Sequence, residues 1–421
     1  MAGKSGIRQP LLAWITSARA LIRLVLISNK DISKIRWWLI LKNGNRRFRR
    51  ESCKLLGSSD VCLRRFFLDM KIGIVLVNYK DYAERFLAPC LESIRALDSA
   101  IKPDIFIVDN ASTVESKVYL QVAAPEARLI TNINNDGFAK GNNDAMRVML
   151  EEGYDYILLL NMDASLAPNA LMELVAAAES NEKAGAIQAR LMLDPERKLI
   201  NSVGNATHFL GFGYCLRYRE KYDEILAGPV DIAYPSGACV LLRSSALKTI
   251  GLFDEEFWMY NEDQDLGWRL WLAGYSCIMA PLAVAFHQYE FSRSQSKYYW
   301  MERNRLIAAW KNYSGLSLFV FFPALLAMEI GMSFFSIRSG WFKEKVKAWS
   351  YLLNPLNWAY LLQARFDTQA LRKVPDYEIL PLFSGRIWYQ EIDHPLLRFV
   401  ANPIFSAYFT VGKMIVKAFK K

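Results

Sequence analysis

The chain has 421 residues, with 52% hydrophobic and 13% aromatic residues, which excludes an intrinsically disordered protein and allows a large buried core. The net charge of +10 is concentrated at one end: residues 1–69 hold 15 Lys and Arg against four Asp and Glu, and the remainder is close to neutral. A nucleic-acid-binding protein would carry this charge on its folded domain, so the distribution argues against nucleic acid and favours a membrane surface as partner. The six cysteines are scattered without a C-x-x-C pair, which fits the reducing cytosol.

The N-terminal segment is basic and partly apolar. Residues 11–27 are apolar except for Arg19 and Arg23, and no small-residue cleavage site follows them, so we expect an interfacial amphipathic helix rather than a signal peptide. A second interpretation has equal weight. Because Met70 opens the first predicted strand, residues 1–69 are then an upstream extension that is dispensable for catalysis.

From Lys71 onward, short apolar runs alternate with helical patterns, which predicts βαβ units and an α/β fold with a mostly parallel, Rossmann-like sheet. The predicted strands are Ile72–Val77, Ile105–Asp109, Arg128–Thr131 and Tyr156–Asn161, and helices are expected near Ala83–Leu97 and Asn142–Glu152. Ligands of such sheets bind beyond the carboxyl ends of the strands. Polar residues follow three of these strands, and they predict a polar cleft: Asn78, Asp109, Asn110, Asn161 and Asp163.

Two motifs fit a nucleotide. Asp109, in VDNAS, can accept a hydrogen bond from a pyrimidine imide, although an Asp after a strand is also a common cap or turn residue. In residues 132–146, Gly137 and Gly141 allow close approach of the backbone to a ligand, and we expect Asn142 to open a helix whose N-terminus favours an anion. A glycine-rich turn with an asparagine cap is the competing interpretation.

Further motifs carry acids and a histidine. Asn161 and Asp163, in LLLNMDASLAP, offer oxygen ligands to a divalent cation with diphosphate, although Asp163 also suits a helix cap. Glu262 and Asp263 lie in an acidic cluster before a helix and predict a general base for an acceptor hydroxyl, although acids at a helix start also complement its dipole. His287 follows the strand-like run LAVAF, where it suits a metal or phosphate contact better than a core position.

The C-terminal region has a different composition. Residues 312–328 carry no charge, Glu329 interrupts them, and the apolar character then continues to Ile337. This length is borderline for a membrane span, so we predict a monotopic or re-entrant segment, with a buried helix as the alternative. The final residues, 402–421, combine apolar residues with lysines such as Lys413 and Lys417, which is typical of a helix that lies on anionic lipid.

These blocks, in this order, resemble the family 2 glycosyltransferases, and within them the rhamnosyltransferase-like enzymes of bacterial surface-polysaccharide synthesis. The resemblance covers Lys71 to Lys311 and rests on VNY, VDNAS, NDGFAKGNN, LLNMDASL, GACVLLR, GLFDEEFWMYNEDQDLGWRL, His287 and Arg303-Asn304. It implies a GT-A fold, a divalent metal (Mg²⁺ or Mn²⁺) and inversion at the anomeric carbon.

The resemblance also implies roles for single residues. Asp109 would bind the base, Asp163 the metal and diphosphate with help from His287, and Asp263, beside Glu262, would be the catalytic base. Asn161 replaces the first acid of the family's metal motif, as is common in the rhamnosyl branch, so we expect metal affinity to be weak and nucleotide-dependent. Arg269 or Lys297 is expected to neutralise the leaving group. The full set of predicted donor contacts is Asn78, Asp109, Asn110, Gly137, Lys140, Asn142, Asn161, Gly237, Arg269 and Arg303.

The sequence thus predicts three regions: a basic extension at 1–69, a glycosyltransferase domain at 70–310 and a helical membrane-associated region at 311–421. The expected donor is dTDP-L-rhamnose, with UDP-linked GlcNAc or galactofuranose as alternatives. The expected acceptor is a lipid-linked saccharide at the cytoplasmic face of the plasma membrane. A nucleotidyltransferase is disfavoured because VNYKDYAERF lacks a glycine-rich basic loop, and the acids at 109, 163 and 262–265 disfavour a non-catalytic scaffold.

Overall fold

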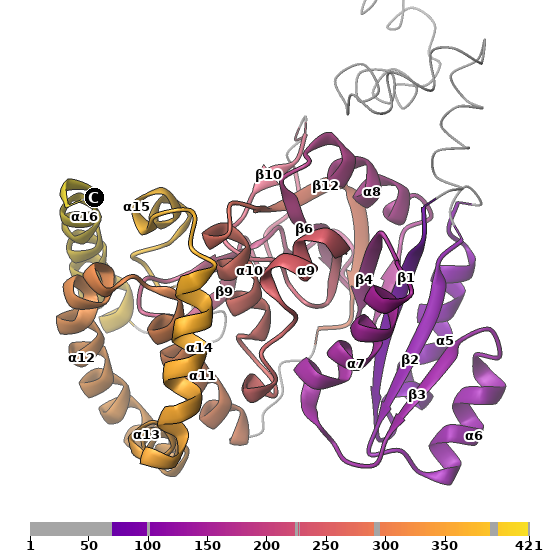
Figure 1. Cartoon of the computed structure of the whole chain (residues 1–421), viewed down its shortest axis with the longest axis horizontal. Coiled ribbons are helices and arrows are strands. Elements are labelled where there is room, and N and C mark those ends of the chain that lie inside the picture. The colour runs from indigo at the N-terminus through magenta and orange to yellow at the C-terminus, as the bar shows by residue number, and fades with distance from the viewer. Residues whose placement is uncertain are drawn as a thin grey trace, which may run out of the picture. The chain divides into compact units, whose positions relative to one another are not determined.

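The computed structural model of the chain describes residues 70–98, 102–223, 226, 228–289, 295–387 and 395–419 (Figure 1). The interfacial helix predicted at 11–27 lies outside the described residues.

In the described part of the chain, ten strands form one sheet with the order β10-β12-β6-β11-β4-β1-β2-β3, while β5 pairs with β12 and β7 with β6. The strands β3, β2, β1 and β4 are parallel to one another, and β12 is parallel to β6, whereas β11 is antiparallel to both β4 and β6. This confirms the predicted mostly parallel sheet. The strands are β1 (Ile72–Tyr79), β2 (Asp104–Asn110), β3 (Arg128–Asn132), β4 (Tyr156–Leu160), β5 (Ala164–Leu166), β6 (Ala184–Leu193), β7 (Ile200–Ser202), β10 (Val230–Asp231), β11 (Cys239–Arg243) and β12 (Ser276–His287).

A separate hairpin lies between β7 and β10 in the chain. Its strands are β8 (Asn205–Thr207) and β9 (Gly213–Cys215), which pair antiparallel outside the main sheet.

Helices cover the sheet on both faces, which explains why its central strands are apolar along their whole length rather than on alternate residues. One face packs on α7, α9 and α10 in a single core cluster that includes Val75, Leu159, Met149 and Leu270. Full burial of each such side chain contributes about 1.5–3 kcal/mol. The helices α5 and α8 supply no residue to that cluster and contact the sheet from its other side. The helices of this region are α5 (Tyr82–Arg95), α6 (Val114–Ala123), α7 (Gly137–Glu151), α8 (Ala170–Ser180), α9 (Ser244–Ile250), the short η1 (Glu255–Phe257) and α10 (Glu262–Leu272).

The start of α7 differs from the prediction. We expected Asn142 to open this helix, but it begins at Gly137, one turn earlier. Gly137 has a left-handed φ of +85° and turns the chain directly into the helix after β3. Asn142 is therefore buried in the second turn, where its Nδ2 atom donates to the carbonyl oxygen of Phe138 over 2.9 Å.

The C-terminal region is helical, as predicted, and buried ion pairs hold its helices together. Glu329 and Lys345 lie 2.6 Å apart, and Arg305 forms ion pairs with both Glu302 and Glu329. Burial opposes ionisation of Glu329, but Arg305 and Lys345 hold its pKa at about 2. The acid that interrupts the apolar run is therefore a bridge between helices. The helices are α11 (Ser296–Asn312), α12 (Gly315–Arg338), α13 (Phe342–Leu353), η2 (Pro355–Asn357), α14 (Trp358–Ala370), α15 (Asp376–Ile379), η3 (Leu380–Leu382), η4 (Leu397–Ala401) and α16 (Asn402–Ala418).

Two segments, α12 and Leu397–Ala418, are long and apolar enough to cross a membrane, by length and composition alone. Only 17% of the most apolar window of α12 is buried, so the alternative of a buried core helix does not describe it. Its exposed apolar residues recur every three or four positions and form one stripe along the helix. This stripe consists of Phe319, Phe322, Leu326, Ile330, Phe334 and Ile337.

Candidate active site

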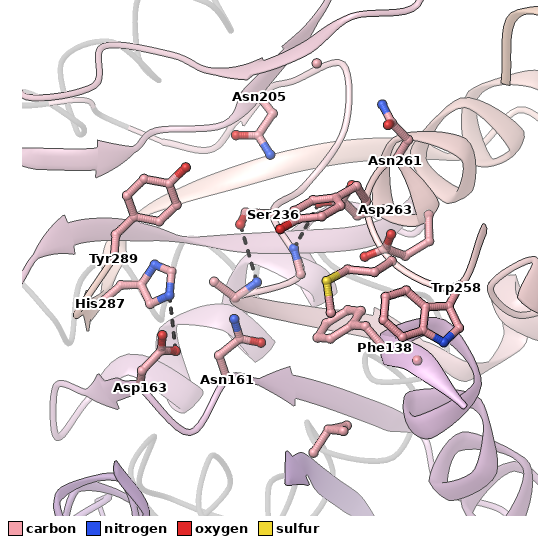
Figure 2. A pocket seen from close by; sticks show the side chains of 18 of the residues that line it. Phe138, Asn161, Asp163, Asn205, Ser236, Trp258, Asn261, Asp263, His287 and Tyr289 are labelled. Atoms are coloured by element: carbon pink, nitrogen blue, oxygen red, sulfur yellow. Dashed lines mark hydrogen bonds and ion pairs between the residues drawn. The ribbon is translucent and has the colours of Figure 1, made fainter. Parts of the chain in front are cut away.

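A cavity of about 570 Å³ opens at the carboxyl edge of the sheet, where β1, β2, β4 and β12 end and α10 begins (Figure 2). Most of the residues that line the cavity form three walls. The Asn110 wall consists of Val77, Tyr79, Asn110, Asn135, Gly137 and Phe138, the Asp163 wall of Asn161, Asp163, His287 and Tyr289, and the Asn205 wall of Asn205, Gly213, Tyr214, Cys215 and Tyr234. Glu262 and Asp263, at the start of α10, also line the cavity.

The Asp163 wall contains an acid and an imidazole in contact. The antiparallel pairing of β5 with β12 sets Ala164 opposite His287, and it thereby brings Asp163 to the histidine. The Nε2 atom of His287 lies 3.2 Å from Oδ1 of Asp163, an oxygen that is buried and has no hydrogen-bond partner. On the other side of the ring, Nδ1 lies 2.9 Å from Oδ1 of Asn201. When Nδ1 donates its proton to Asn201, Nε2 presents a lone pair beside the carboxylate oxygen, and these two acceptors can hold a cation.

This arrangement fits a divalent cation held by few protein ligands. A buried carboxylate oxygen and an oriented imidazole are suitable donors, and Asn201 would set the tautomer of the histidine from behind. In the described residues, no three His, Cys, Asp or Glu side chains are grouped to hold a metal. Any cation at Asp163 and His287 would therefore take its remaining ligands from diphosphate oxygens or water.

The buried Glu262 and the half-buried Asp263 form an acid pair with unequal surroundings. The Oδ2 atom of Asp263 accepts a hydrogen bond from the Gly237 amide over 3.3 Å, and Oδ1 accepts one from the Gln264 amide over 2.8 Å. Burial raises the pKa of Asp263 to about 6 in spite of these donors. Burial and the charge of Asp263 raise the pKa of Glu262 well above its ordinary value, and its buried Oε2 has no hydrogen-bond partner. Because the charge of Asp263 raises the pKa of Glu262, ionisation of Asp263 opposes ionisation of its neighbour.

The loop before α10 is strained. Trp258, Tyr260 and Asn261 have φ values of +58°, +69° and +65°, which non-glycine residues adopt rarely and at an energetic cost. The buried side chain of Asn304, on α11, holds this loop by donating from Nδ2 to the carbonyl oxygens of Phe257, Met259 and Tyr260 at 2.7–2.9 Å. Asn304 therefore holds the strained backbone in place immediately before Glu262 and Asp263.

The strained loop also interlocks with the Asn110 wall. The indole nitrogen of Trp258 donates to the carbonyl oxygen of Asn135 over 3.3 Å, and the amide of Ala139 donates to the carbonyl oxygen of Trp258 over 3.1 Å. A Cβ atom on Gly137 would lie 2.5 Å from both the carbonyl oxygen and the Cδ1 atom of Trp258. Gly137 is therefore required both for its left-handed backbone and for this close approach.

Of the residues predicted after the first two strands, the structure brings one to the cavity. Asp109 is buried: its Oδ1 accepts from Asn78 over 2.7 Å and its Oδ2 accepts from Ser116 over 2.6 Å. Asn78 is also buried and accepts from the amide of Ala83, which orders the start of α5. Asn110 lines the cavity instead. Base binding by Asp109 stays a prediction, and in this structure its carboxylate orders the turn behind the wall.

Six of the ten predicted donor contacts, together with Lys297, are absent from the lining of the cavity: Asn78, Asp109, Lys140, Asn142, Arg269 and Arg303. Asn110, Gly137, Asn161 and Gly237 belong to the lining. Lys140 pairs with Asp136 and Asp144, and Asn142 caps a carbonyl within its own helix. Arg269 is buried, pairs with Asp265 over 2.8 Å and donates to the carbonyl oxygens of Ile250 and Leu252. Arg303 donates to the carbonyl oxygen of Glu256 and stacks over Trp300. These side chains support the fold around the site, because helix geometry and packing turn them inward.

Several residues of the site were not found from the sequence. Asn201, Asn205 and Tyr214 come from strands of three residues, which are too short to show a periodic pattern. Asn304 lies in a block that we noted for the resemblance, but no local pattern indicates that its amide holds a distant loop.

Comparisons with known proteins bear on the family and the fold. The model of Glycosyl transferase family 2 matches residues 73–251. An N-acetylglucosaminyl-diphospho-decaprenol L-rhamnosyltransferase of Mycobacterium tuberculosis is 27% identical over 239 residues, which is 51% of this chain and 75% of that protein. A low-salt glycan biosynthesis hexosyltransferase of Haloferax volcanii is 26% identical over 247 residues, 56% of this chain and 75% of that protein. A crystal structure of GalNAc-T7 with UDP, GalNAc and Mn²⁺ aligns with a TM-score of 0.50 and 12% identity, over 69% of this chain and 57% of that one.

The fold and the site define a GT-A-type glycosyltransferase that uses a nucleotide-sugar donor. The sheet, the cavity at its carboxyl edge and the acid pair all belong to the region that the family model covers or to its direct continuation. Residues 73–251 of the chain match glycosyl transferase family 2.

Proposed function

We propose that this enzyme transfers a sugar, with inversion, from a nucleoside-diphosphate sugar to a hydroxyl group of a lipid-linked saccharide in cell-surface polysaccharide synthesis. The observation that carries the proposal is that one cavity holds both the Asp263 carboxylate and the Asp163–His287 pair. The first candidate donor is dTDP-L-rhamnose, because the relative from Mycobacterium tuberculosis is named a rhamnosyltransferase. A UDP-GlcNAc donor is the second, because a poly-β-1,6-N-acetyl-D-glucosamine synthase of Staphylococcus aureus is 23% identical over 197 residues, 47% of this chain and 45% of that protein.

Asp263 is the catalytic base of the proposed reaction. Its carboxylate is ionised at neutral pH, lies in the cavity and has lone pairs left beyond those bound to the Gly237 and Gln264 amides. It accepts the proton of the acceptor hydroxyl as that oxygen attacks the anomeric carbon opposite the departing diphosphate. A positioned base of this kind contributes about 10²–10⁴-fold to the rate. Glu262, whose pKa is raised by burial and by the charge of Asp263, lines the same part of the cavity.

Asp163 and His287 would hold a divalent cation, Mg²⁺ or Mn²⁺, which when bound would neutralise the charge that develops on the diphosphate. Asn161, at the end of β4 on the same wall, would contact the diphosphate through its amide. With only two protein ligands, we expect cation binding to depend on the nucleotide.

We place the catalytic domain at residues 70–310 and a membrane-associated region at 311–421. Two features support a position on the inner face of the plasma membrane: the exposed apolar stripe of α12, and α16, which combines exposed Ile404 and Met414 with Lys413 and Lys417. Stable anchoring generally needs two signals, and these helices supply an apolar one and a basic one.

A donor screen tests the proposal. Purified full-length protein is incubated with dTDP-rhamnose, UDP-GlcNAc, UDP-galactofuranose or GDP-mannose, Mn²⁺ and bacterial lipid extract, and nucleoside diphosphate release is measured. We expect one donor to be consumed at least ten times faster than the others, in a lipid-dependent reaction. Release that does not depend on the lipid extract for any donor would contradict the proposed acceptor class.

A further inference from the structure

The Asn205 wall carries a side-chain amide nitrogen that has no hydrogen-bond partner in the described part of the chain. Asn205 is only 4% exposed, and its Oδ1 accepts from Ser202 over 2.9 Å, which leaves both protons of Nδ2 without a partner there. Figure 2 shows the side chain of this residue directed toward the cavity. The buried Oε2 atom of Glu262 also has no partner. The Asn205 amide and the Glu262 carboxyl group, which both line the cavity, are therefore available to a polar ligand.

Most of this wall belongs to the β8–β9 hairpin, which packs against the C-terminal helices. In the turn between β8 and β9, Phe209 stacks on Phe409 of α16, with ring centroids 5.0 Å apart, and contacts Phe321 of α12 edge to face at 5.3 Å. Closer to the cavity, the hydroxyl of Tyr214 donates to the carbonyl oxygen of Arg386 over 2.9 Å. The amide of Ser384 donates to the carbonyl oxygen of Thr207 over 2.9 Å.

The hairpin is also tied to the acid pair. The Nε2 atom of Gln264 lies 3.2 Å from the hydroxyl oxygen of Thr207, and its Oε1 accepts from the Asn261 side chain over 2.6 Å. The helix that presents Asp263 and the hairpin that presents Asn205 are therefore held in one hydrogen-bonded frame.

We propose that the β8–β9 hairpin is the acceptor-recognition element, which binds the sugar unit that receives the transferred residue. Asn205 donates to a hydroxyl or carbonyl oxygen of that sugar, Glu262 donates to a second oxygen, and the rings of Tyr214 and Tyr234 form an apolar surface beside it. The inference rests on the proposed function and names the residues that choose its acceptor.

Three observations favour an acceptor sugar over the donor at this wall. The Asn110 and Asp163 walls already supply the strand-end amides and the cation ligands that a nucleoside diphosphate needs. The acceptor hydroxyl must reach Asp263, and the frame through Gln264 places the hairpin beside that base. A sugar needs directional hydrogen bonds together with an apolar face, and this wall offers both.

The anchoring of the hairpin also explains how a lipid-linked sugar would reach the site. The turn is packed against α12 and α16, which belong to the two described segments that are long and apolar enough to cross a membrane. The β8–β9 hairpin would therefore bind the sugar at Asn205 and at the same time contact the membrane-associated helices. Loops carried on a rigid scaffold commonly determine specificity in this way.

The test uses full-length protein in detergent and decyl glycosides of glucose, galactose, rhamnose and N-acetylglucosamine as acceptor probes. Binding is measured by saturation-transfer NMR, and transfer by nucleoside diphosphate release. Asn205→Asp keeps the size and the acceptor oxygen but removes the donor, and Asn205→Ala removes both. We expect each variant to raise the Kd and KM of the best glycoside about tenfold, the equivalent of one hydrogen bond, and at least five times more than it raises the donor KM. Asn169→Ala, an exposed residue whose side chain makes no cap hydrogen bond, is the matched control.

The outcomes separate this inference from the proposed function. Equal increases in donor and acceptor KM, or an unchanged Kd for the glycoside in a folded variant, would overturn the acceptor role of the hairpin and leave the transferase intact. Failure of every glycoside to bind the wild type would also overturn it. Glycoside binding without consumption of any nucleotide sugar would support the saccharide site and contradict the proposed transfer instead.

Discussion

The Nε2 atom of His287 lies 3.2 Å from the unpartnered Oδ1 atom of Asp163. A metal ion bound to both atoms would take the place of a proton between them. We expect Asp163→Ala and His287→Ala each to raise the Mn²⁺ concentration for half-maximal activity at least tenfold, because each removes one of only two protein ligands. Mn²⁺ binding in the presence of nucleoside diphosphate, followed by electron paramagnetic resonance, should weaken in parallel. Asp223→Ala, on an exposed side chain, is the control. Full activity of the wild type in excess chelator would contradict the metal site.

Asp263→Asn should lower kcat at least a hundredfold and change the nucleotide Kd less than threefold, because it removes the base and keeps the shape. For the wild type, kcat should fall as the pH falls through about 6, where Asp263 gains its proton and can no longer accept one. Activity above one-hundredth of the wild type in the variant would remove Asp263 from this role.

The raised pKa of Asp263 also affects stability, in the opposite direction to its effect on kcat: kcat falls as the pH falls, whereas stability falls as the pH rises. Because the folded-state pKa of Asp263 is raised from 3.8 to about 6, the folded protein binds more protons than the unfolded chain between these values. Stability contributed by this group is therefore lost as the pH rises through that window, and Asp263→Asn should flatten the slope there. Urea unfolding at several pH values measures this difference between the two proteins, in both of which Glu262 is present.

Continuous apolar runs predicted the strands well, since each central strand is buried on both faces: the first was expected at Ile72–Val77 and extends to Tyr79. The ends of the predicted strands also indicated that Asp163 and His287 lie in the cavity, because the carboxyl ends of parallel strands meet at one edge of the sheet. The direction of a helical side chain was less predictable. Arg269 follows the acid cluster at a plausible distance, but its i,i+4 partner Asp265 and two carbonyl groups turn it into the core. The hairpin at Asn205 gave no signal, because its strands are short and its contacts come from distant residues between Gln264 and Phe409.

Gly137→Ala should weaken donor binding, because the added Cβ atom would collide with the backbone and ring of Trp258 at 2.5 Å. Gly153→Ala is a matched control, since Gly153 has a similar φ of +77° but nothing within 4 Å of a Cβ atom. Both variants should lose about 1–2 kcal/mol of stability from the left-handed backbone. Only Gly137→Ala should raise the nucleotide Kd, by at least tenfold in isothermal calorimetry. Similar Kd values for the two variants would show that the contact with Trp258 is unimportant for the donor.

Asn304→Ala should destabilise the loop that leads to the acid pair. It leaves three carbonyl groups of strained or adjacent residues without their donor, which costs about 2–5 kcal/mol of unfolding free energy. We expect a lower Tm and a kcat reduced more strongly than the donor affinity. Asn357→Ala removes one amide-to-carbonyl hydrogen bond, to Tyr351, in the helical region, and should lower Tm slightly with kcat preserved. If both variants lost only stability, the loop geometry would not matter for catalysis.

The apolar stripe of α12 should account for much of the affinity for membranes. Phe319 and Phe334 are 80% and 72% exposed, and burial of each in lipid would contribute about 1.5–3 kcal/mol, so replacing both with Ser should lower vesicle binding at least a hundredfold. The control is Val118→Ser with Val122→Ser on α6, far from α12 in the sequence. These side chains are 54% and 76% exposed, and their replacement should leave vesicle binding unchanged. Co-sedimentation with anionic and neutral vesicles measures both pairs. Equal losses in the two pairs, or none in either, would contradict the assignment.

The basic part of the same contact is tested on α16. Deleting residues 405–421 is a poor probe, because Phe409 is buried against Phe209 and Phe321 and its removal would open a core. Lys413→Gln with Lys417→Gln keeps that packing and removes two charges near the exposed face of the helix. We expect binding to anionic vesicles to weaken about tenfold or more, since each lysine near such a surface contributes about 1 kcal/mol, while binding to neutral vesicles stays the same. High salt should remove the difference, because screening acts within about 10 Å on exposed charge. A variant that bound both vesicle types as tightly as the wild type would limit α16 to packing against α12.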